Sequence, residues 1–231
     1  LFRSNDFIVT NQFELQGFKN PIYPDIVLFV NGIPLVIIEA KSPFRRNWLE
    51  DAVERENFRK YRSTGNGYER LMFYNHILVA TCGTQARHGT ISSDVNHFQN
   101  SRWSSAYPLT IEQVEEKYGK SREQEVLIAG MLERSHLLDL LKDYVIYQTI
   151  GNKRVKIIAK HQQYRAVTKC TKQIKTVEGR RGGVIWHTQG SGKSYTMQWV
   201  AKQAIQYGNL PLVIVTDRRQ LDKQIHTTFS E

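Results

Sequence analysis

Three polar side chains stand where a predicted β-hairpin would gather them at one end of a sheet. Residues 25–43 form two apolar, β-branched runs around an Asn-Gly pair, the preferred two-residue hairpin turn. Asp25 opens the first arm, and Glu39 and Lys41 end the second. Because side chains two residues apart on a strand share a face, Glu39 and Lys41 point the same way, and the turn brings Asp25 to the same end.

This constellation suits the hydrolysis of a phosphodiester bond. Two converging carboxylates offer the oxygen ligands that Mg²⁺ prefers, so Asp25 and Glu39 are the expected metal ligands. A neighbouring lysine can orient the attacking water or stabilise charge on the phosphate, which makes Asp25, Glu39 and Lys41 the expected catalytic residues. The alternative is that these residues are ordinary charges at strand ends, joined by a surface salt bridge.

A second candidate site is the stretch WHTQGSGKS, which has the ending of a phosphate-binding loop but His187 in place of the first glycine. Backbone N–H groups of residues 190–194 can surround a phosphate at the start of the following helix, where the dipole favours an anion. Lys193 would reach the phosphates of ATP, and Ser194 would bind Mg²⁺. A chance Gly-Lys-Ser in a glycine-rich turn is the alternative. The expected nucleotide-binding residues here are Thr188, Gln189, Gly190, Ser191, Gly192, Lys193 and Ser194.

Hydrophobic periodicity predicts the elements that must position both sites. Alternation indicates strands, and apolar residues three or four apart indicate helices. In the N-terminal part we expect a strand at 7–15, the hairpin at 25–43, a helix at 47–62, a strand at 76–83 and a helix at 123–147, broken near Gly130. Leu49, Val53 and Phe58 fall on one side of the helix at 47–62.

The C-terminal part is predicted to begin a parallel α/β unit. A helix with its approach covers 155–177, a strand covers 184–186, the glycine-rich turn and a helix follow, and a second buried strand covers 210–217. Two strands in 80 residues are too few for a complete nucleotide-driven domain. We therefore expect the chain to be the N-terminal piece of a longer protein.

Charge separates the two parts of the chain. Residues 1–150 carry 17 Lys+Arg against 18 Asp+Glu, and residues 151–231 carry 15 against 4, so balances of −1 and +11 give the net charge of +10. A strongly basic second part indicates a polyanion, with nucleic acid the first choice. The alternative is a solvated basic face, or one that meets an acidic domain.

Nothing in the sequence indicates export or membrane insertion. The chain has no signal peptide and no apolar run long enough to span a bilayer, so no membrane association is expected. The two cysteines, Cys82 and Cys170, lie far apart and match no metal-binding spacing. We expect reduced thiols in a cytoplasmic protein.

Three segments of the basic part resemble motifs of superfamily 2 helicases and translocases. HTQGSGKS resembles motif I, and residues 213–225 resemble motif Ia, which implies that Thr216 and Arg218 contact a nucleic-acid backbone. HQQYRAV resembles the glutamine motif that reads adenine. The resemblance implies that Gln163 contacts the adenine of ATP, with Gln162 as the alternative.

The Pro-Asp…Glu-x-Lys pattern of the hairpin resembles a large nuclease superfamily that uses one or two metal ions. That superfamily often supplies an extra acid from the N-terminal side, for which Glu14 is the candidate. RecB-like members also carry a glutamine and a tyrosine four residues apart on the following helix. Here Asn57 and Tyr61 hold those positions, and the asparagine departs from the pattern by one methylene.

A nuclease core followed directly by such a motor resembles the R subunit of type I restriction enzymes along the whole chain. The resemblance implies an α/β fold: a PD-(D/E)xK nuclease-like mixed sheet flanked by helices at 1–150, then the first part of a RecA-like parallel α/β motor domain at 151–231. It implies Mg²⁺ and ATP as cofactors, and double-stranded DNA with specificity and methylation subunits as partners. Cleavage would follow ATP-driven translocation.

Two other functions fit the same residues. A helicase-nuclease of repair or anti-phage defence would share the chemistry without methylation partners. A DNA-binding motor scaffold would carry an inactive acidic pair. No Asp-Glu box follows the phosphate loop up to residue 231, so we expect this piece alone not to turn over ATP.

Overall fold

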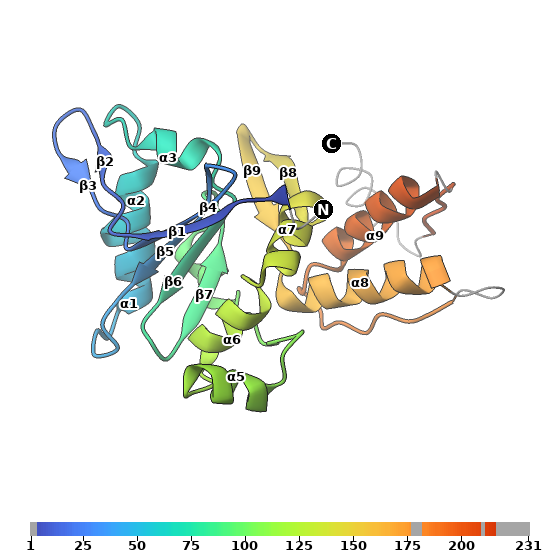
Figure 1. Ribbon diagram of the computed structural model, residues 1–231. Coiled ribbons are helices and arrows are strands. Elements are labelled where there is room, and N and C mark those ends of the chain that lie inside the picture. Colours follow the sequence, from blue (N-terminus) through green and yellow to red (C-terminus); the bar gives the residue numbers. More distant parts are fainter. Residues whose placement is uncertain (1–3, 177–181, 209–210, 216–231) are drawn as a thin grey trace.

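The protein folds around a mixed β-sheet covered by helices (Figure 1). The computed structural model describes residues 4–176, 182–208 and 211–215. The sheet has the order β1-β4-β5-β6-β7, in which β5 and β6 are parallel and the other neighbours antiparallel. Its strands are β1 Phe7–Asn11, β4 Ile26–Val30, β5 Ile33–Ala40, β6 Ile77–Thr81 and β7 Ala86–Gly89. A separate two-stranded ribbon is formed by β2 Leu15–Gln16 and β3 Pro21–Ile22.

The predicted hairpin is confirmed as β4 and β5. Asn31 and Gly32 form its turn, with φ of 52° and 78°, because a two-residue turn of this kind needs positive φ at both central positions. Ile26 pairs with Ile38, so the residue before β4 lies beside the end of β5. The register of the hairpin therefore places the candidate carboxylates at one end of the sheet.

One face of the sheet is covered by helices that follow β5. They are α1 Trp48–Glu50, the π-helix η2 Asp51–Arg55, α2 Asn57–Arg62, α3 Glu69–Phe73 and α4 Val95–Gln99. The helix predicted at 47–62 is present but is interrupted by the π-helical turn. Leu49, Val53 and Phe58 are buried, and they pack with Ile37 and Leu78 of the sheet.

The remaining elements pack against the other face or extend from it. They are α5 Ile111–Tyr118, α6 Glu123–Gly130, α7 Arg134–Asp143, β8 Val145–Ile150, β9 Lys153–Ile158, α8 His161–Thr176 and α9 Lys193–Gly208. Val36, Ile38 and Val79 of the sheet share one hydrophobic cluster with Val167 of α8 and Trp199 of α9. Among the described residues, no helix has both the length and the apolar character needed to cross a bilayer.

Two predicted helices differ from the structure at their ends. The helix expected at 123–147 breaks after Gly130, as predicted, but ends at Asp143 because β8 follows. The helix expected from residue 155 begins at His161, since the preceding residues form β9. Strands β8 and β9 pair as an antiparallel hairpin. The boundary expected between residues 150 and 151 lies at the turn of this hairpin.

The two strands predicted on either side of the phosphate loop are not formed in the described residues. Neither 184–186 nor 211–215 is assigned to a strand. Val184, Trp186 and Val213 are about nine-tenths exposed. A strand needs a neighbour for its backbone hydrogen bonds, and an apolar, β-branched run alone does not provide one. The glycine-rich turn and the helix after it, α9, are present as predicted.

Candidate functional site

The two carboxylates of the hairpin lie on one face of the sheet, because side chains two residues apart on a strand point the same way. Glu39 lies two residues after Ile37, whose side chain faces the layer of α1, η2 and α2. Asp25 lies two residues before Val27, which packs into the same layer. The two carboxyl groups are close enough that the charge of Asp25 raises the pKa of Glu39.

Asp25 is held in place by its neighbours on both sides. Its Oδ2 accepts the Ala40 backbone N–H at 2.8 Å, and its Oδ1 accepts the Gln12 side-chain amide at 3.1 Å. Gln12 has a φ of 49°, which is uncommon for a residue other than glycine, and its backbone N–H also donates to the Asp25 carbonyl at 2.9 Å. Gln12 is a site residue that the sequence did not reveal, because an isolated glutamine after a strand has no distinctive pattern.

Glu39 is a fully buried acid with one free oxygen. Its Oε1 accepts the Tyr61 hydroxyl at 2.7 Å, while its Oε2 has no hydrogen-bond partner in the part of the chain that the structure describes. Burial, opposed by the Tyr61 hydrogen bond and assisted by Asp25, raises the pKa of Glu39 to about 8. Near neutral pH the group therefore keeps its proton unless a cation stabilises the carboxylate.

Lys41 lies on the same face, but its amine is bound to other partners. It donates to Glu56 at 2.9 Å and also to the Asn57 side-chain oxygen. Its side chain is 12% exposed, and its charge lowers the pKa of Glu39. Glu56 also accepts Arg45 at 2.8 Å. Lys41 thus lies next to the acidic pair, and its amine is bound by residues of the helical layer.

The interrupted helix presents these partners to the sheet. The π-helical turn η2 ends at Arg55, and Glu56 caps it directly before α2. Asn57 and Tyr61, four residues apart on α2, point to the same side, and the Asn57 amide donates to the Tyr61 hydroxyl at 3.3 Å. A continuous chain of hydrogen bonds therefore runs from Lys41 through Asn57 and Tyr61 to Glu39. Glu14 is exposed between β1 and β2.

The acidic pair has the donor set of a magnesium site. Mg²⁺ is usually bound by one or two carboxylates and several waters. Asp25 and Glu39 supply two carboxylates, and the unpartnered buried Oε2 of Glu39 is free to act as a ligand. Among the described residues, no group of three or more His, Cys, Asp or Glu side chains could hold a metal. A cation at this pair would therefore keep much of its water.

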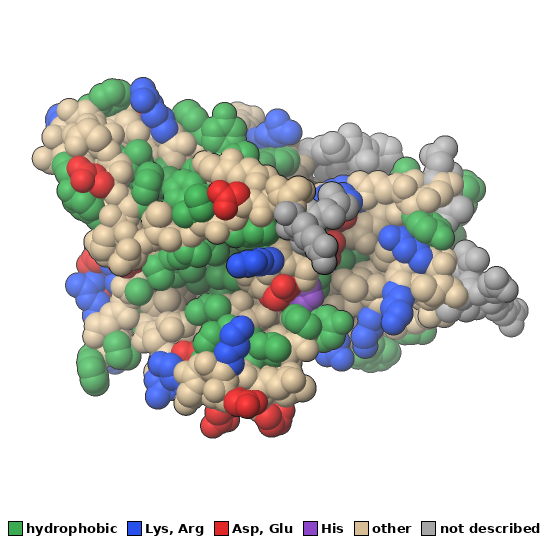
Figure 2. All heavy atoms as spheres, viewed as in Figure 1, with side chains coloured by type: hydrophobic (Ala, Val, Ile, Leu, Met, Phe, Trp, Pro, Cys, Tyr) green, Lys and Arg blue, Asp and Glu red, His purple; other side chains and the backbone are tan. Residues whose placement is uncertain are grey.

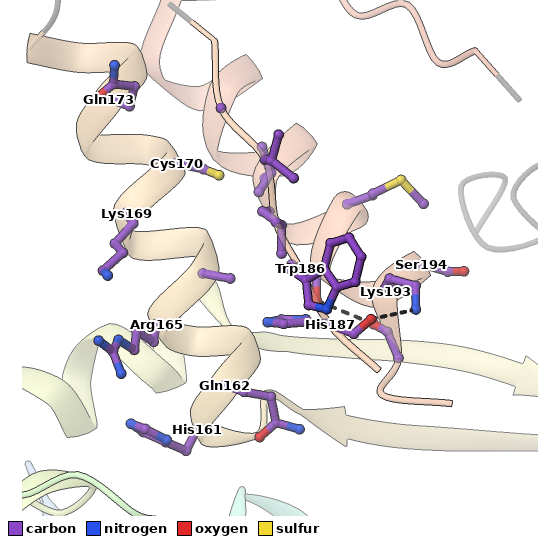
Figure 3. A pocket seen from close by; sticks show the side chains of 18 of the residues that line it. His161, Gln162, Arg165, Lys169, Cys170, Gln173, Trp186, His187, Lys193 and Ser194 are labelled. Carbon is purple, nitrogen blue, oxygen red and sulfur yellow. Dashed lines mark hydrogen bonds between the residues drawn. The ribbon is translucent and has the colours of Figure 1, made fainter. Parts of the chain in front are cut away.

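The phosphate loop wraps in front of the first turn of α9. Gly190 and Gly192 have φ of 75° and 78°, a conformation that favours glycine. Lys193, the first residue of α9, donates its amine to the carbonyls of His187 at 3.1 Å and Thr188 at 2.9 Å (Figure 3). Its ammonium group thus lies inside the loop, where a bound phosphate would compete for it.

Gln163 is buried against the phosphate loop. Its amide donates to the carbonyls of Ser191 and Gly192, both at 3.1 Å, and its side-chain oxygen accepts the Lys160 backbone N–H at 2.8 Å. A Cβ at residue 192 would lie 2.5 Å from the Gln163 amide nitrogen. Gln162, the alternative adenine contact, lines the neighbouring cavity instead (Figure 3).

This cavity has a volume of about 1850 Å³ and a basic lining. Helix α8 contributes Arg165 and Lys169 to its wall. No Asp or Glu occurs among the described residues from 151 onwards, and Figure 2 shows basic side chains along α8. The Ser191 hydroxyl and His187 Nδ1 are buried without a hydrogen-bond partner among the described residues. The lining fits a polyphosphate. Thr216 and Arg218 lie outside the described residues.

Fold and sites together define a mixed α/β protein with a pair of neighbouring carboxylates and a glycine-rich loop before a helix. Residues 2–97 match the family model described as the N terminus of type I restriction enzyme R protein, and residues 162–231 match that of the SWI2/SNF2 ATPase. These matches confirm the resemblance to the type I restriction enzyme R protein that the motifs predicted.

Curated relatives match nearly the whole chain. The putative type I restriction enzyme MjaIXP endonuclease subunit of Methanocaldococcus jannaschii is 33% identical over 98% of this chain. The type I restriction enzyme HindI endonuclease subunit of Haemophilus influenzae is 34% identical over 98%, and the SsaAORF53P endonuclease subunit of Staphylococcus saprophyticus is 25% identical over 98%. The chain spans only 23% and 22% of the lengths of the first two relatives.

Proposed function

We propose that this chain supplies the DNA-cutting site of a type I restriction enzyme and the first part of its ATP-driven motor. Residues 1–150 would form a PD-(D/E)xK nuclease domain, and residues 151–231 would begin a RecA-like motor domain of superfamily 2. The two family matches fall on either side of this division and support it. The enzyme would act in the cytoplasm.

At the nuclease site Asp25 and Glu39 would hold Mg²⁺, which supplies Lewis acidity and an activated water when bound. The protein's own part is orientation and charge. Ala40 and Gln12 fix the Asp25 carboxylate, and Tyr61 fixes that of Glu39. Lys41 would exchange Glu56 for the scissile phosphate and stabilise the charge that develops there.

At the motor site ATP would occupy the cavity between α8 and the phosphate loop. Its phosphates would replace the loop carbonyls as partners of Lys193, and Ser194 would assist the bound Mg²⁺. Gln163 holds the loop, so its predicted contact with adenine requires an exchange of its present bonds, whereas Gln162 already faces the cavity. Double-stranded DNA is the proposed substrate, and specificity and methylation subunits are the proposed partners.

The observation that carries the proposal is the convergence of Asp25 with Glu39, whose buried Oε2 is unpartnered. In the assembled enzyme, with Mg²⁺ and ATP, we expect Asp25→Asn and Lys41→Ala each to lower cleavage of unmodified plasmid by more than about 100-fold. ATP hydrolysis should persist in both variants. Lys193→Ala should abolish ATP hydrolysis and, with it, cleavage at a distance.

Gel assays of plasmid cleavage and phosphate-release assays separate these effects. The exposed Glu116→Gln is the matched control and should keep both activities. If Asp25→Asn cuts DNA at the normal rate, the pocket is not the cutting site, and the chain is a motor scaffold with an inert acidic pair. Loss of both activities in Asp25→Asn would also contradict the division of labour.

A further inference from the structure

A tight turn directly after the candidate catalytic lysine presents an exposed aromatic side chain. The Arg45 backbone N–H donates to the Ser42 carbonyl at 3.1 Å, which closes a four-residue turn. Pro43 at the second position fixes its φ, and the Ser42 hydroxyl accepts the Phe44 N–H at 3.3 Å. Phe44 therefore stands at the tip, with 95% of its surface exposed.

Single exposed apolar residues are common on proteins and by themselves need no explanation. The position of Phe44 is what distinguishes it. The turn follows Lys41 with no intervening element, and Figure 1 shows the link from β5 to α1 projecting beyond the end of the helix. The turn thus extends the rim of the candidate nuclease site outward.

The base of the turn is fixed to that site by ion pairs. Arg45 binds Glu56 at 2.8 Å and Asp51 at 3.3 Å, and Glu56 also binds Lys41 at 2.9 Å. One carboxylate therefore joins the turn to the candidate catalytic lysine. The next residue, Arg46, is exposed and makes no ion pair in the described part of the chain. An unengaged cation lies beside the aromatic tip.

We propose that this turn, residues 42–46, is a DNA-contacting wedge of the cleavage site. Arg46 would bind a backbone phosphate, and Phe44 would insert between or stack on bases next to the scissile phosphate. Proteins commonly combine cations on phosphates with apolar or aromatic side chains that unstack a base step. The inference rests on the proposed function, because it takes the phosphodiester near Lys41 to belong to duplex DNA.

The turn is preorganised for such a contact. Pro43 and the two Ser42 hydrogen bonds restrict the backbone before DNA arrives, so less conformational entropy is lost on binding. A Phe side chain has few rotatable bonds and a large flat face. The cation of Arg46, which makes no ion pair among the described residues, favours nucleic acid over an apolar protein groove as the occupant.

The test measures DNA binding separately from cutting. In the assembled enzyme carrying Asp25→Asn, which prevents cleavage, the added Phe44→Ala should weaken binding of a short duplex roughly tenfold. Phe44→Trp should retain the affinity. Phe73→Ala, which removes another exposed phenylalanine, is the matched control and should leave affinity within about twofold. Arg46→Ala should reduce the slope of log affinity against log salt concentration by about one, the value expected for one lost phosphate contact.

The fluorescence of a duplex containing 2-aminopurine measures base unstacking directly. This fluorescence should rise on binding when Phe44 is present and stay low with Phe44→Ala, because an unstacked base loses its quenching neighbours. If Phe44→Ala binds and unstacks the duplex like its parent while Lys41-dependent cutting continues, the wedge is wrong and the nuclease proposal stands.

The opposite failure gives a different result. If the enzyme without Asp25→Asn does not cut DNA, the nuclease proposal fails, yet a Phe44-dependent affinity and fluorescence change would still support the wedge. If Phe44→Ala instead leaves DNA binding unchanged and weakens assembly with the other subunits in gel filtration, the turn is a protein contact and the inference is overturned.

Discussion

At the scale of single residues, the ionised form of Glu39 lowers the stability of the folded protein, yet the side chain lies where a cation could bind it. The burial that raises its pKa from 4.5 to about 8 disfavours the ionised form in the folded, metal-free protein. The unfolded chain loses this proton near 4.5, whereas the folded chain holds it up to about 8. Stability from this group is therefore fully present below pH 4.5 and is lost as pH rises towards 8.

We therefore expect Glu39→Gln to stabilise the metal-free protein at high pH. The glutamine keeps an oxygen for the Tyr61 hydroxyl but cannot ionise. Relative to its effect at pH 5, the substitution should raise the free energy of unfolding at pH 9 by a few kcal/mol, on the order set by the pKa shift. Urea denaturation in EDTA at both pH values measures this difference.

The exposed Glu116→Gln is the control for this experiment and should show the same stability change at both pH values. Comparing each variant with the parent at the same pH removes the contribution of every other titrating group. A Glu39→Gln effect that is equal at pH 5 and pH 9 would mean that Glu39 ionises normally. The acidic pair would then gain no electrostatic stabilisation from a bound cation beyond that of an ordinary carboxylate pair.

At the scale of elements, the phosphate loop depends on Gly192 for two separate reasons. The residue has positive φ, and a Cβ there would meet the Gln163 amide nitrogen at 2.5 Å. Gly190 also has positive φ, but a Cβ there would meet nothing within 4 Å. Comparing substitutions at these two glycines therefore separates backbone strain from collision with α8.

We expect Gly192→Ala to weaken binding of a fluorescent ATP analogue more than Gly190→Ala does. Adding Gln163→Ala to Gly192→Ala should recover part of the loss, because the collision is removed while the strain remains. Gln163→Ala alone should weaken binding, because two loop carbonyls lose their donor. Strictly additive effects in this double-mutant cycle would show that α8 does not hold the loop.

Local sequence signals predicted some elements and missed others for identifiable reasons. The hairpin β4–β5 was predictable because Asn31-Gly32 has a distinctive turn chemistry between two β-branched runs. Hairpin β8–β9 has a weaker turn signal in the sequence, a single glycine, Gly151, inside a segment that also has helical periodicity. In the structure Gly151 has a φ of 61°. The runs at 184–186 and 211–215 show that composition alone does not make a strand without a pairing partner.

The part of the candidate site that lies on the hairpin was predictable from the alternation of side chains along a strand. Asp25 and Glu39 were expected to meet because alternation and one turn determine their faces, and the structure places them together. Gln12 and Glu56 were missed because they reach the site through a positive-φ residue and a π-helical interruption. Both features depend on tertiary packing, and neither produces a regular spacing of residues in the sequence.

At the scale of the whole molecule, the candidate cutting and nucleotide sites lie on one continuous core. Trp199 of α9 is fully buried, and its ring lies 6.4 Å from that of Tyr144, which follows α7. The Tyr144 hydroxyl bonds Thr168 of α8 at 2.8 Å, and both aromatic residues share a cluster with Val79 of the sheet. The packing therefore continues across residue 150, where the sequence predicted a division between two domains.

We expect this shared core to make the described halves unfold together. Trp199→Ala should lower the free energy of unfolding by about 3–5 kcal/mol. Amide hydrogen exchange should speed up in β6 as well as in α9, because both elements border the same cluster. Trp186→Ala, at a residue that is 91% exposed, should change stability by less than about 0.5 kcal/mol. If Trp199→Ala accelerates exchange in α8 and α9 but leaves β6 unchanged, the two halves are energetically separate. Any influence of nucleotide on cutting would then have to pass through elements other than this core.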